Sequence, residues 1–186
     1  CHVFFNGQYL GMLNIREASN KQYGYSNFGI NTDDMDQFEN WHVLKEGDAG
    51  AWNELQSRAS RLASSRSAKD YEAVKELLDV DEFINYMAVQ CYFGGSDWMP
   101  NTNNIKYYRS RSDGGRFRYV LFDVDSAFDL DSHSMFNDVA DGRTGGGETG
   151  KLFRNLLKYE PFRSQFLDVM CLVEGSIFEF NRNQEM

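Results

Sequence analysis

"IKYYRSRSDGGRFRYVLFDVD" (residues 105–125) holds two apolar stretches that are separated by a turn and followed by two carboxylates. Residues 105–110 and 116–122 are rich in aromatic and aliphatic side chains, which favours strands. The intervening "SDGG" has the residue types that turns prefer. The sequence therefore predicts a β-hairpin whose second strand ends at Asp123 and Asp125.

A helix is predicted directly upstream of this hairpin. Its apolar residues recur at helical spacing and would form one continuous buried stripe. They are Val80, Phe83, Ile84, Met87, Ala88 and Cys91. Asp79 and Glu82 have the spacing of a capping box, and the glycines from Gly94 favour the end of a helix. This helix would present the loop that contains Asp97.

The rest of the chain is predicted to contain one more hairpin and four more helices. Asn6-Gly7 favours a tight turn between strands at residues 2–5 and 8–16. Helical periodicity covers residues 49–65, 69–78, 149–158 and 161–180. Residues 19–47 are rich in Asn, Asp and Gly, so we expect irregular connections there. The fold class is therefore α+β.

Composition limits the function classes. The chain has 186 residues, enough for one sizeable core, and its net charge of -9 argues against a general binder of nucleic acid or anionic membranes. No apolar run approaches the ~20 residues that span a bilayer. Three dispersed cysteines suggest neither a disulfide framework nor a CxxC metal site. Residues 1–5 already resemble a strand in mid-course, so we expect further chain, including any targeting segment, upstream of Cys1.

The predicted hairpin brings polar side chains together. Asn104 precedes its first arm and Asp123 follows its second, and antiparallel pairing makes these two positions neighbours. Asp97 lies a few residues before Asn104, and Asp125 lies two residues after Asp123. Carboxylate and carboxamide oxygens are the ligands that magnesium and calcium prefer. The sequence thus predicts a cation site, and the alternative is a polar loop cluster with Asx turns.

The order of these elements matches the catalytic elements of protein kinases. In that class a helix leads to a loop with Asp and Asn, and a hairpin then leads to a second Asp. The loop Asp positions the attacking hydroxyl, while the loop Asn and the second Asp hold magnesium. The upstream hairpin would correspond to the last strands of the small lobe, which run into the hinge beside the adenine.

Three stretches together resemble the CotH (spore coat protein H) family of atypical protein kinases. They are "FFNGQYLGMLNIREASN", "DWMPNTNNIKYYR" and "YVLFDVDSAFD", and the resemblance covers roughly residues 3–130. It implies that Asp97 is the catalytic base, that Asn104 and Asp123 are magnesium ligands, and that Asp125 supports Asp123. Glu17 would lie near the hinge, in the ATP site.

The same resemblance implies a kinase-like fold, with residues 1–18 as the end of the small lobe and hinge and residues 19–186 as a mostly helical large lobe. It also implies ATP and Mg²⁺ as cofactors, a protein as substrate, and a secreted or cell-surface location. The Gly-rich loop and the ATP-pairing Lys would belong upstream of Cys1, so residues 1–186 alone could be inactive.

Two other classes of protein remain as alternatives. The first is a non-catalytic surface or adhesion module that keeps the kinase-like fold. The second is a calcium-stabilised binding domain built on the acidic run Asp123, Asp125, Asp129 and Asp131. We rank the calcium alternative lowest, because this run lacks the sixth-position Gly and the twelfth-position Glu of an EF-hand loop.

Two further patterns carry little weight. Gly145 to Lys151 matches most of a phosphate-binding loop, but Leu152 replaces the Ser/Thr that would contact magnesium, and no buried strand is predicted before it. The histidines, His2, His42 and His133, lack the spacing of a zinc site. We expect them to be surface or hydrogen-bonded side chains.

Overall fold

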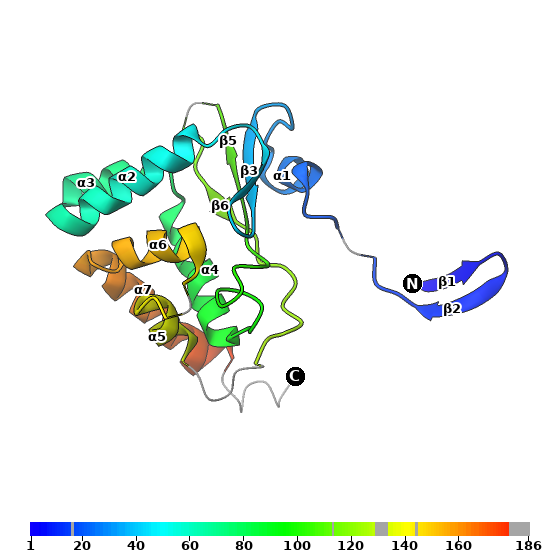
Figure 1. Ribbon diagram of the computed structural model, residues 1–186. Helices are drawn as coiled ribbons and strands as arrows, with labels where there is room; N and C mark the ends of the chain where they lie inside the picture. The colour runs from blue at the N-terminus through cyan, green and yellow to red at the C-terminus, as the bar shows by residue number, and fades with distance from the viewer. Residues whose placement is uncertain (16, 113, 129–133, 144, 179–186) are drawn as a thin grey trace.

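The computed structural model describes residues 1–186 except 16, 113, 129–133, 144 and 179–186, and it has an α+β fold (Figure 1). The strands are β1 (His2–Phe5), β2 (Gln8–Met12), β3 (Met35–Glu39), β4 (Val43–Glu46), β5 (Lys106–Ser110) and β6 (Arg118–Tyr119). The helices are α1 (Lys21–Phe28), α2 (Gly50–Ser65), α3 (Ala68–Lys75), α4 (Val80–Phe93), α5 (Met135–Ala140), α6 (Gly147–Leu156) and α7 (Glu160–Leu172), and a π-helical turn (Val173–Ile177) follows α7.

The predicted hairpin exists as β5 and β6, but it is part of a larger sheet. The strand order is β4-β3-β5-β6, and all neighbouring pairs are antiparallel. The expectation that residues 19–47 are irregular was therefore wrong, since they contain α1, β3 and β4. The buried polar side chain of Asp36 obscured β3 in the sequence, and its charge is balanced by Arg109 of β5 at 3.1 Å.

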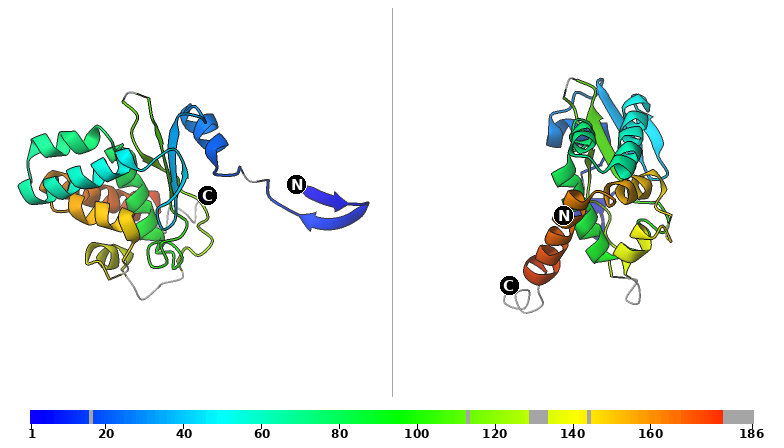
Figure 2. Two further views of the ribbon diagram at one scale, coloured as in Figure 1. Left: turned by 45° about the horizontal axis from the view of Figure 1, so that its top comes forward. Right: turned by 90° about the vertical axis from the view of Figure 1, so that its left-hand side faces the viewer.

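The two faces of this sheet are covered by different helices (Figures 1 and 2). Tyr23 of α1 packs on Tyr108 on one face, with ring centroids 6.1 Å apart. On the other face Trp52 of α2 stacks on Tyr107 at 4.5 Å. Phe83 of α4 packs on the same side of the sheet, against the ring of Tyr119. Alternate residues of β5 thus anchor helices on opposite faces.

His42 is a hydrogen-bonded histidine within this aromatic core. Its ring stacks on Phe38 at 4.3 Å, and its Nδ1 atom lies 2.6 Å from the Tyr107 hydroxyl. Burial lowers the pKa of His42. His2 likewise pairs with the Tyr9 hydroxyl. These two agree with the expectation, and His133 lies outside the described residues.

The helical periodicity in the sequence located five helices correctly, within about three residues at their ends except for the last one, which was predicted to continue to residue 180 but ends at Leu172 and continues as the π-helical turn Val173–Ile177. These are α2, α3, α4, α6 and α7. Helix α4 runs through the centre of the molecule, with α7 packed beside it (Figure 1). Helix α6 packs on α2 and contacts α4 through the rings of Phe153 and Phe83. Helix α5 was not predicted, because six residues are too few to show an apolar period.

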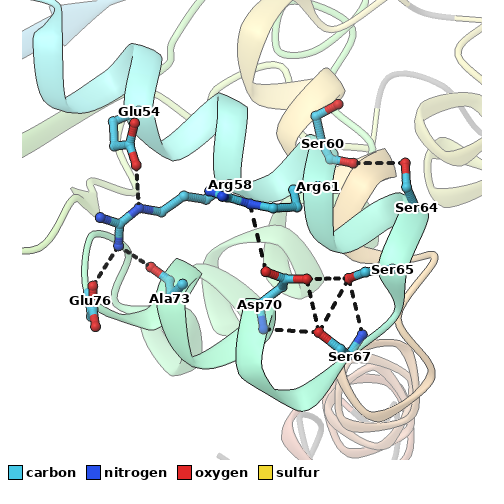
Figure 3. Close-up of polar contacts among 10 residues, drawn as sticks. All are labelled: Glu54, Arg58, Ser60, Arg61, Ser64, Ser65, Ser67, Asp70, Ala73 and Glu76. Carbon is cyan, nitrogen blue, oxygen red and sulfur yellow. Dashed lines mark hydrogen bonds and ion pairs between the residues drawn. The ribbon is translucent and has the colours of Figure 1, made fainter.

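A polar network fixes the connection between α2 and α3 (Figure 3). Arg58 of α2 donates to Glu54 in its own helix. It also donates to the Ala73 carbonyl in α3 and to the carboxylate of Glu76, the residue that follows α3. At the turn, the carboxylate of Asp70 accepts hydrogen bonds from the Ser65 and Ser67 hydroxyls. Because both ends of α3 are tied to α2, the turn between the two helices has a defined conformation.

The N-terminal hairpin was predicted correctly in type, although β2 ends at Met12 rather than at residue 16. Asn6 and Gly7 both have positive φ, at 50° and 79°, as the tight turn requires. The hairpin lies away from the four-stranded sheet in both Figures 1 and 2, and apolar side chains such as Phe4 and Phe5 are exposed. Whether residues 1–18 are a lobe end and hinge stays a prediction.

The centre of α4 supplies the first stability prediction. Met87 is fully buried in the core, so Met87→Ala is expected to lower the free energy of unfolding by about 2–5 kcal/mol through lost burial and a cavity. Chemical denaturation measures this loss. The exposed Asn85 on the same helix provides a control, since Asn85→Ala is expected to change stability by less than about 0.5 kcal/mol. Equal effects of the two substitutions would show that the buried face of α4 is misassigned.

Glu82 does not form the capping box that its spacing suggested. Its carboxylate accepts from the backbone N–H of Tyr119 in β6, at 3.0 and 3.2 Å, and the side chain of Asp79 forms no capping bond to α4. Burial raises the pKa of Glu82 to about 7. The Glu82 carboxyl therefore connects α4 to the sheet, and it keeps its proton at pH values well above the ordinary pKa of a glutamate side chain.

This raised pKa predicts a pH dependence of stability. Between the ordinary Glu pKa and about pH 7, the folded protein holds a proton that the unfolded chain has released. The free energy of unfolding therefore falls as the pH rises through this window. Glu82→Gln cannot ionise, so its stability relative to wild type is expected to increase by about 2–3 kcal/mol between pH 5 and pH 8. Urea denaturation at both pH values tests this, and identical pH dependence of the two proteins would contradict it.

Candidate functional site

The loop after α4 positions Asp97. Helix α4 ends at Phe93, and Gly94, which has a φ of 60°, caps it by donating its backbone N–H to the Gln90 carbonyl. One residue beyond Asp97, Trp98 is buried, and its Nε1 donates to the Tyr86 hydroxyl at 3.0 Å. Met99 is buried as well. Asp97 is thus held by a fixed helix end on one side and by two buried side chains on the other.

Asn104 connects the two acidic parts of the site. Its amide nitrogen donates to Oδ2 of Asp97 at 2.6 Å and to the backbone carbonyl of Asp123 at 3.2 Å. The prediction that hairpin pairing brings Asn104 and Asp123 together is confirmed. Since the amide nitrogen makes both bonds, Oδ1 is the atom of this side chain that could face a cation.

The backbone at these positions is unusual. Thr102, Asn104 and Asp123 have φ values of 48°, 51° and 51°, in the left-handed region that few residues other than glycine occupy. Asn and Asp tolerate this conformation better than most residues, whereas Thr is β-branched. Strained backbone is concentrated at active sites and ligand-binding loops. The local conformation therefore supports a functional role for this loop and for the end of the hairpin.

The carboxylates of the site influence one another. Partial burial raises the pKa of Asp97, and the negative charges of Asp125 and Asp123 raise it further. Asp125 is therefore close enough to act on Asp97 electrostatically, although no hydrogen bond joins them in the described residues. A cation placed among these groups would relieve the repulsion.

The donor set fits magnesium held jointly with a nucleotide. Within the described part of the chain, no three His, Cys, Asp or Glu side chains gather closely enough to hold a metal by themselves. Magnesium at phosphate-transfer sites usually takes only one or two carboxylates, and phosphates and water supply its other ligands. Asp129 and Asp131 lie outside the described residues, so the calcium alternative is described only at Asp123 and Asp125.

A cavity of about 500 Å³ adjoins Asp123, which is within the size range of small-molecule sites. It lies between the segment before α1 and the sheet. Its lining residues are Glu17, Ala18, Ser19, Asn20, Tyr23, Glu39, Lys106, Val120, Leu121, Phe122 and Asp123. The cavity therefore joins the predicted hinge residue Glu17 to the predicted metal ligand Asp123.

Lys106 is a cavity residue that the sequence interpretation missed. Its Nζ atom lies 3.2 Å from a carboxylate oxygen of Glu39, donates to the Ser19 carbonyl at 3.1 Å, and sits 4.7 Å above the Phe122 ring. Alternation along β5 places Lys106 on the same face as Tyr108 but indicates none of its partners. These partners come from distant segments of the chain.

Glu17 lines the cavity together with Asp123, whereas Asp97, Asn104 and Asp125 are not among its lining residues. Its carboxylate accepts from the Asn27 amide at 3.2 and 3.3 Å. No hydrogen bond among the described residues joins it to Asp97 or Asn104. The structure thus places Glu17 at the cavity wall and the other four predicted residues around the loop and the end of the hairpin.

The phosphate-loop pattern lies elsewhere. Helix α5 rather than a strand precedes it, and Lys151 pairs with Glu148 on α6 at 3.7 Å. Lys151 does not line the cavity beside Asp123. The pattern is therefore explained by a glycine-containing connection into a helix, as the sequence interpretation favoured.

An α+β fold with an Asp loop, an Asn and a second Asp joined by a hairpin is compatible with a kinase-like protein. The family model described as CotH kinase protein matches residues 1–184, so the chain belongs to the CotH kinase protein family. Comparisons with curated proteins and with solved structures find no match. In the described residues, no helix combines the length and apolar character needed to cross a bilayer.

Proposed function

We propose that this protein transfers the γ-phosphate of ATP to a hydroxyl of a protein substrate with the help of magnesium. The observation that carries the proposal is the pair of hydrogen bonds from Asn104 to Asp97 and to the Asp123 backbone. They hold together the groups that phosphoryl transfer requires, namely a carboxylate for the acceptor hydroxyl and ligands for a metal.

Asp97 would position the acceptor hydroxyl and accept its proton. Burial and the neighbouring charges raise the pKa of Asp97, which makes it a better proton acceptor than an ordinary carboxylate. The bond from Asn104 fixes the orientation of the carboxylate. Because phosphoryl transfer depends mainly on alignment and charge stabilisation, a fixed carboxylate can contribute strongly without covalent chemistry.

Asn104 and Asp123 would hold magnesium, with Asp125 in support. When bound, magnesium neutralises charge on the phosphates. The chain contributes the rigid hairpin that sets the spacing of its ligands, and the left-handed backbone at Asn104 and Asp123 directs their side chains. Burial is the main cause of the raised pKa of Asp97, and the negative charges of Asp125 and Asp123, which a cation would neutralise, raise it further.

The cavity that Asp123 shares with Glu17 and Lys106 is the proposed nucleotide site. Tyr23 and Phe122 supply apolar and aromatic surface for a base, and the ammonium of Lys106 is held in place by Glu39. The same proposal includes residues 1–18 as the lobe end and hinge, residues 19–186 as the large lobe, and a secreted or surface location. That location rests on the resemblance alone.

Magnesium-dependent ATP binding tests this proposal. In thermal-shift measurements, the melting temperature of the full-length protein is expected to rise with Mg-ATP and to stay near that of the free protein with ATP and a chelator. Transfer of labelled γ-phosphate to protein is expected under the first condition only. If full-length protein shows no magnesium-dependent shift, the non-catalytic surface or adhesion module replaces the kinase.

A further inference from the structure

A second, larger hollow lies on another part of the molecule, where α5, the α6–α7 junction and the turn after α2 meet. Its volume is about 700 Å³, and none of its lining residues belongs to the cavity beside Asp123. The lining residues are Arg66, Phe136, Ala140, Lys151, Arg154, Asn155, Leu157, Lys158, Tyr159, Glu160, Pro161 and Arg163. We call this hollow the basic groove.

The basic groove is strongly cationic in an acidic chain. The chain has 28 acidic against 19 basic side chains, yet five of the 12 groove residues are Lys or Arg and only one, Glu160, is acidic. Among the described residues, Arg66, Lys158 and Arg163 form no ion pair with a carboxylate. Gathering like charges without counter-charges costs free energy, which an anionic ligand would recover.

The walls of the basic groove are fixed by hydrogen bonds. Arg154 donates from Nη1 to the Val139 carbonyl at 3.2 Å and to the Gly145 carbonyl at 3.1 Å, which joins α5 to α6. Arg163 donates to the Leu157 carbonyl at 3.2 Å and so braces the α6–α7 junction. These two arginines therefore shape the groove.

The rim of the groove is also held in place. Arg66 lies in the turn between α2 and α3, with a φ of 52°, and the Ser65, Ser67 and Asp70 network of Figure 3 surrounds that turn. Arg66 and Lys158 are both exposed. Neither makes a hydrogen bond through its side chain to another described residue. They are the cations that remain available to a ligand.

We propose that the basic groove docks a short acidic segment of a polypeptide partner. Its volume accommodates several side chains, and the half-buried Phe136 and the exposed Pro161 add apolar surface for the apolar residues of such a segment. A long nucleic acid would extend over a chain whose net charge is -9, whereas a short segment meets the groove alone. A concave groove also suits a peptide better than a flat membrane surface. This inference is independent of the proposed phosphotransfer.

Peptide binding tests the inference. We expect a fluorescein-labelled peptide with six consecutive glutamates to bind the wild-type protein in anisotropy titrations at low salt, and the matching glutamine peptide not to bind. Arg66→Glu with Lys158→Glu is expected to weaken binding about tenfold or more. The control reverses two exposed cations outside the groove and outside the cavity beside Asp123, Lys69→Glu with Arg116→Glu, and is expected to stay within about twofold of wild type.

The outcomes separate the groove from its alternatives. Equal losses in the two double variants would show that general charge, not the groove, attracts the peptide, and would overturn the inference. So would the absence of glutamate-peptide binding, or groove-dependent binding only to phosphatidylserine vesicles or only to single-stranded DNA. The neutral variant Arg66→Gln with Lys158→Gln, which adds no repulsion, is expected to show a smaller loss in the same direction. Magnesium-dependent ATP binding is expected to be unchanged in every variant.

Discussion

Asp123→Asn is expected to weaken magnesium-dependent ATP binding and to reduce phosphotransfer by the full-length protein about 100-fold or more. The substitution keeps the shape of the side chain but removes a carboxylate from a site for a hard cation. Asn also tolerates the φ of 51° at this position, so no backbone strain is added. The apo fold is expected to be equally or slightly more stable, because Asp97, Asp123 and Asp125 repel one another.

Thermal shift with and without Mg-ATP, together with γ-phosphate transfer, measures both effects. Asp168→Asn is a matched control, since Asp168 is an exposed carboxylate on α7, away from the site. It is expected to behave as wild type. If Asp123→Asn also behaves as wild type in both measurements, the polar loop with Asx turns is the better description of the hairpin end.

The arrangement of Asn104 and Asp123 could be predicted because it follows from local chemistry. A turn such as "SDGG" between two apolar stretches folds the chain back on itself, and the residues that flank the arms then meet. Helix α4 was equally accessible, because its apolar stripe and its terminal glycine are both encoded within 15 residues of sequence. For these elements, local pattern and tertiary structure agree.

Strand β3 and the cavity could not be predicted in this way. Asp36 reads as a loop residue until Arg109, 73 residues further along the chain, is placed beside it. Lys106 reads as a surface lysine until Ser19 and Glu39 surround it. Glu82 has a local capping position but bonds to Tyr119 instead. In each case a partner distant in sequence determines the environment, and no periodicity records it.

Asp97→Asn is expected to reduce phosphotransfer by about 10²–10⁴-fold while leaving magnesium-dependent ATP binding near the wild-type level. The carboxylate acts on the acceptor hydroxyl, so its loss affects the transfer step more than the binding of nucleotide. The amide oxygen of the new side chain can still accept from Asn104, which keeps the loop in place. Thermal shift and phosphotransfer measured on the same samples separate the two effects.

Together, the two substitutions distinguish a phosphotransfer site from a mere acidic cluster. An acidic cluster that attracts magnesium by its charge would respond equally to the loss of Asp97 or Asp123, since each removes one negative charge from the same field. The proposed site predicts a division of roles, in which Asp123→Asn impairs both binding and transfer and Asp97→Asn impairs transfer alone. Equal losses of ATP binding in both variants would remove the distinction between catalytic base and metal ligand. The two hydrogen bonds of Asn104, to Asp97 and to the Asp123 carbonyl, would then no longer support the proposal of a kinase site.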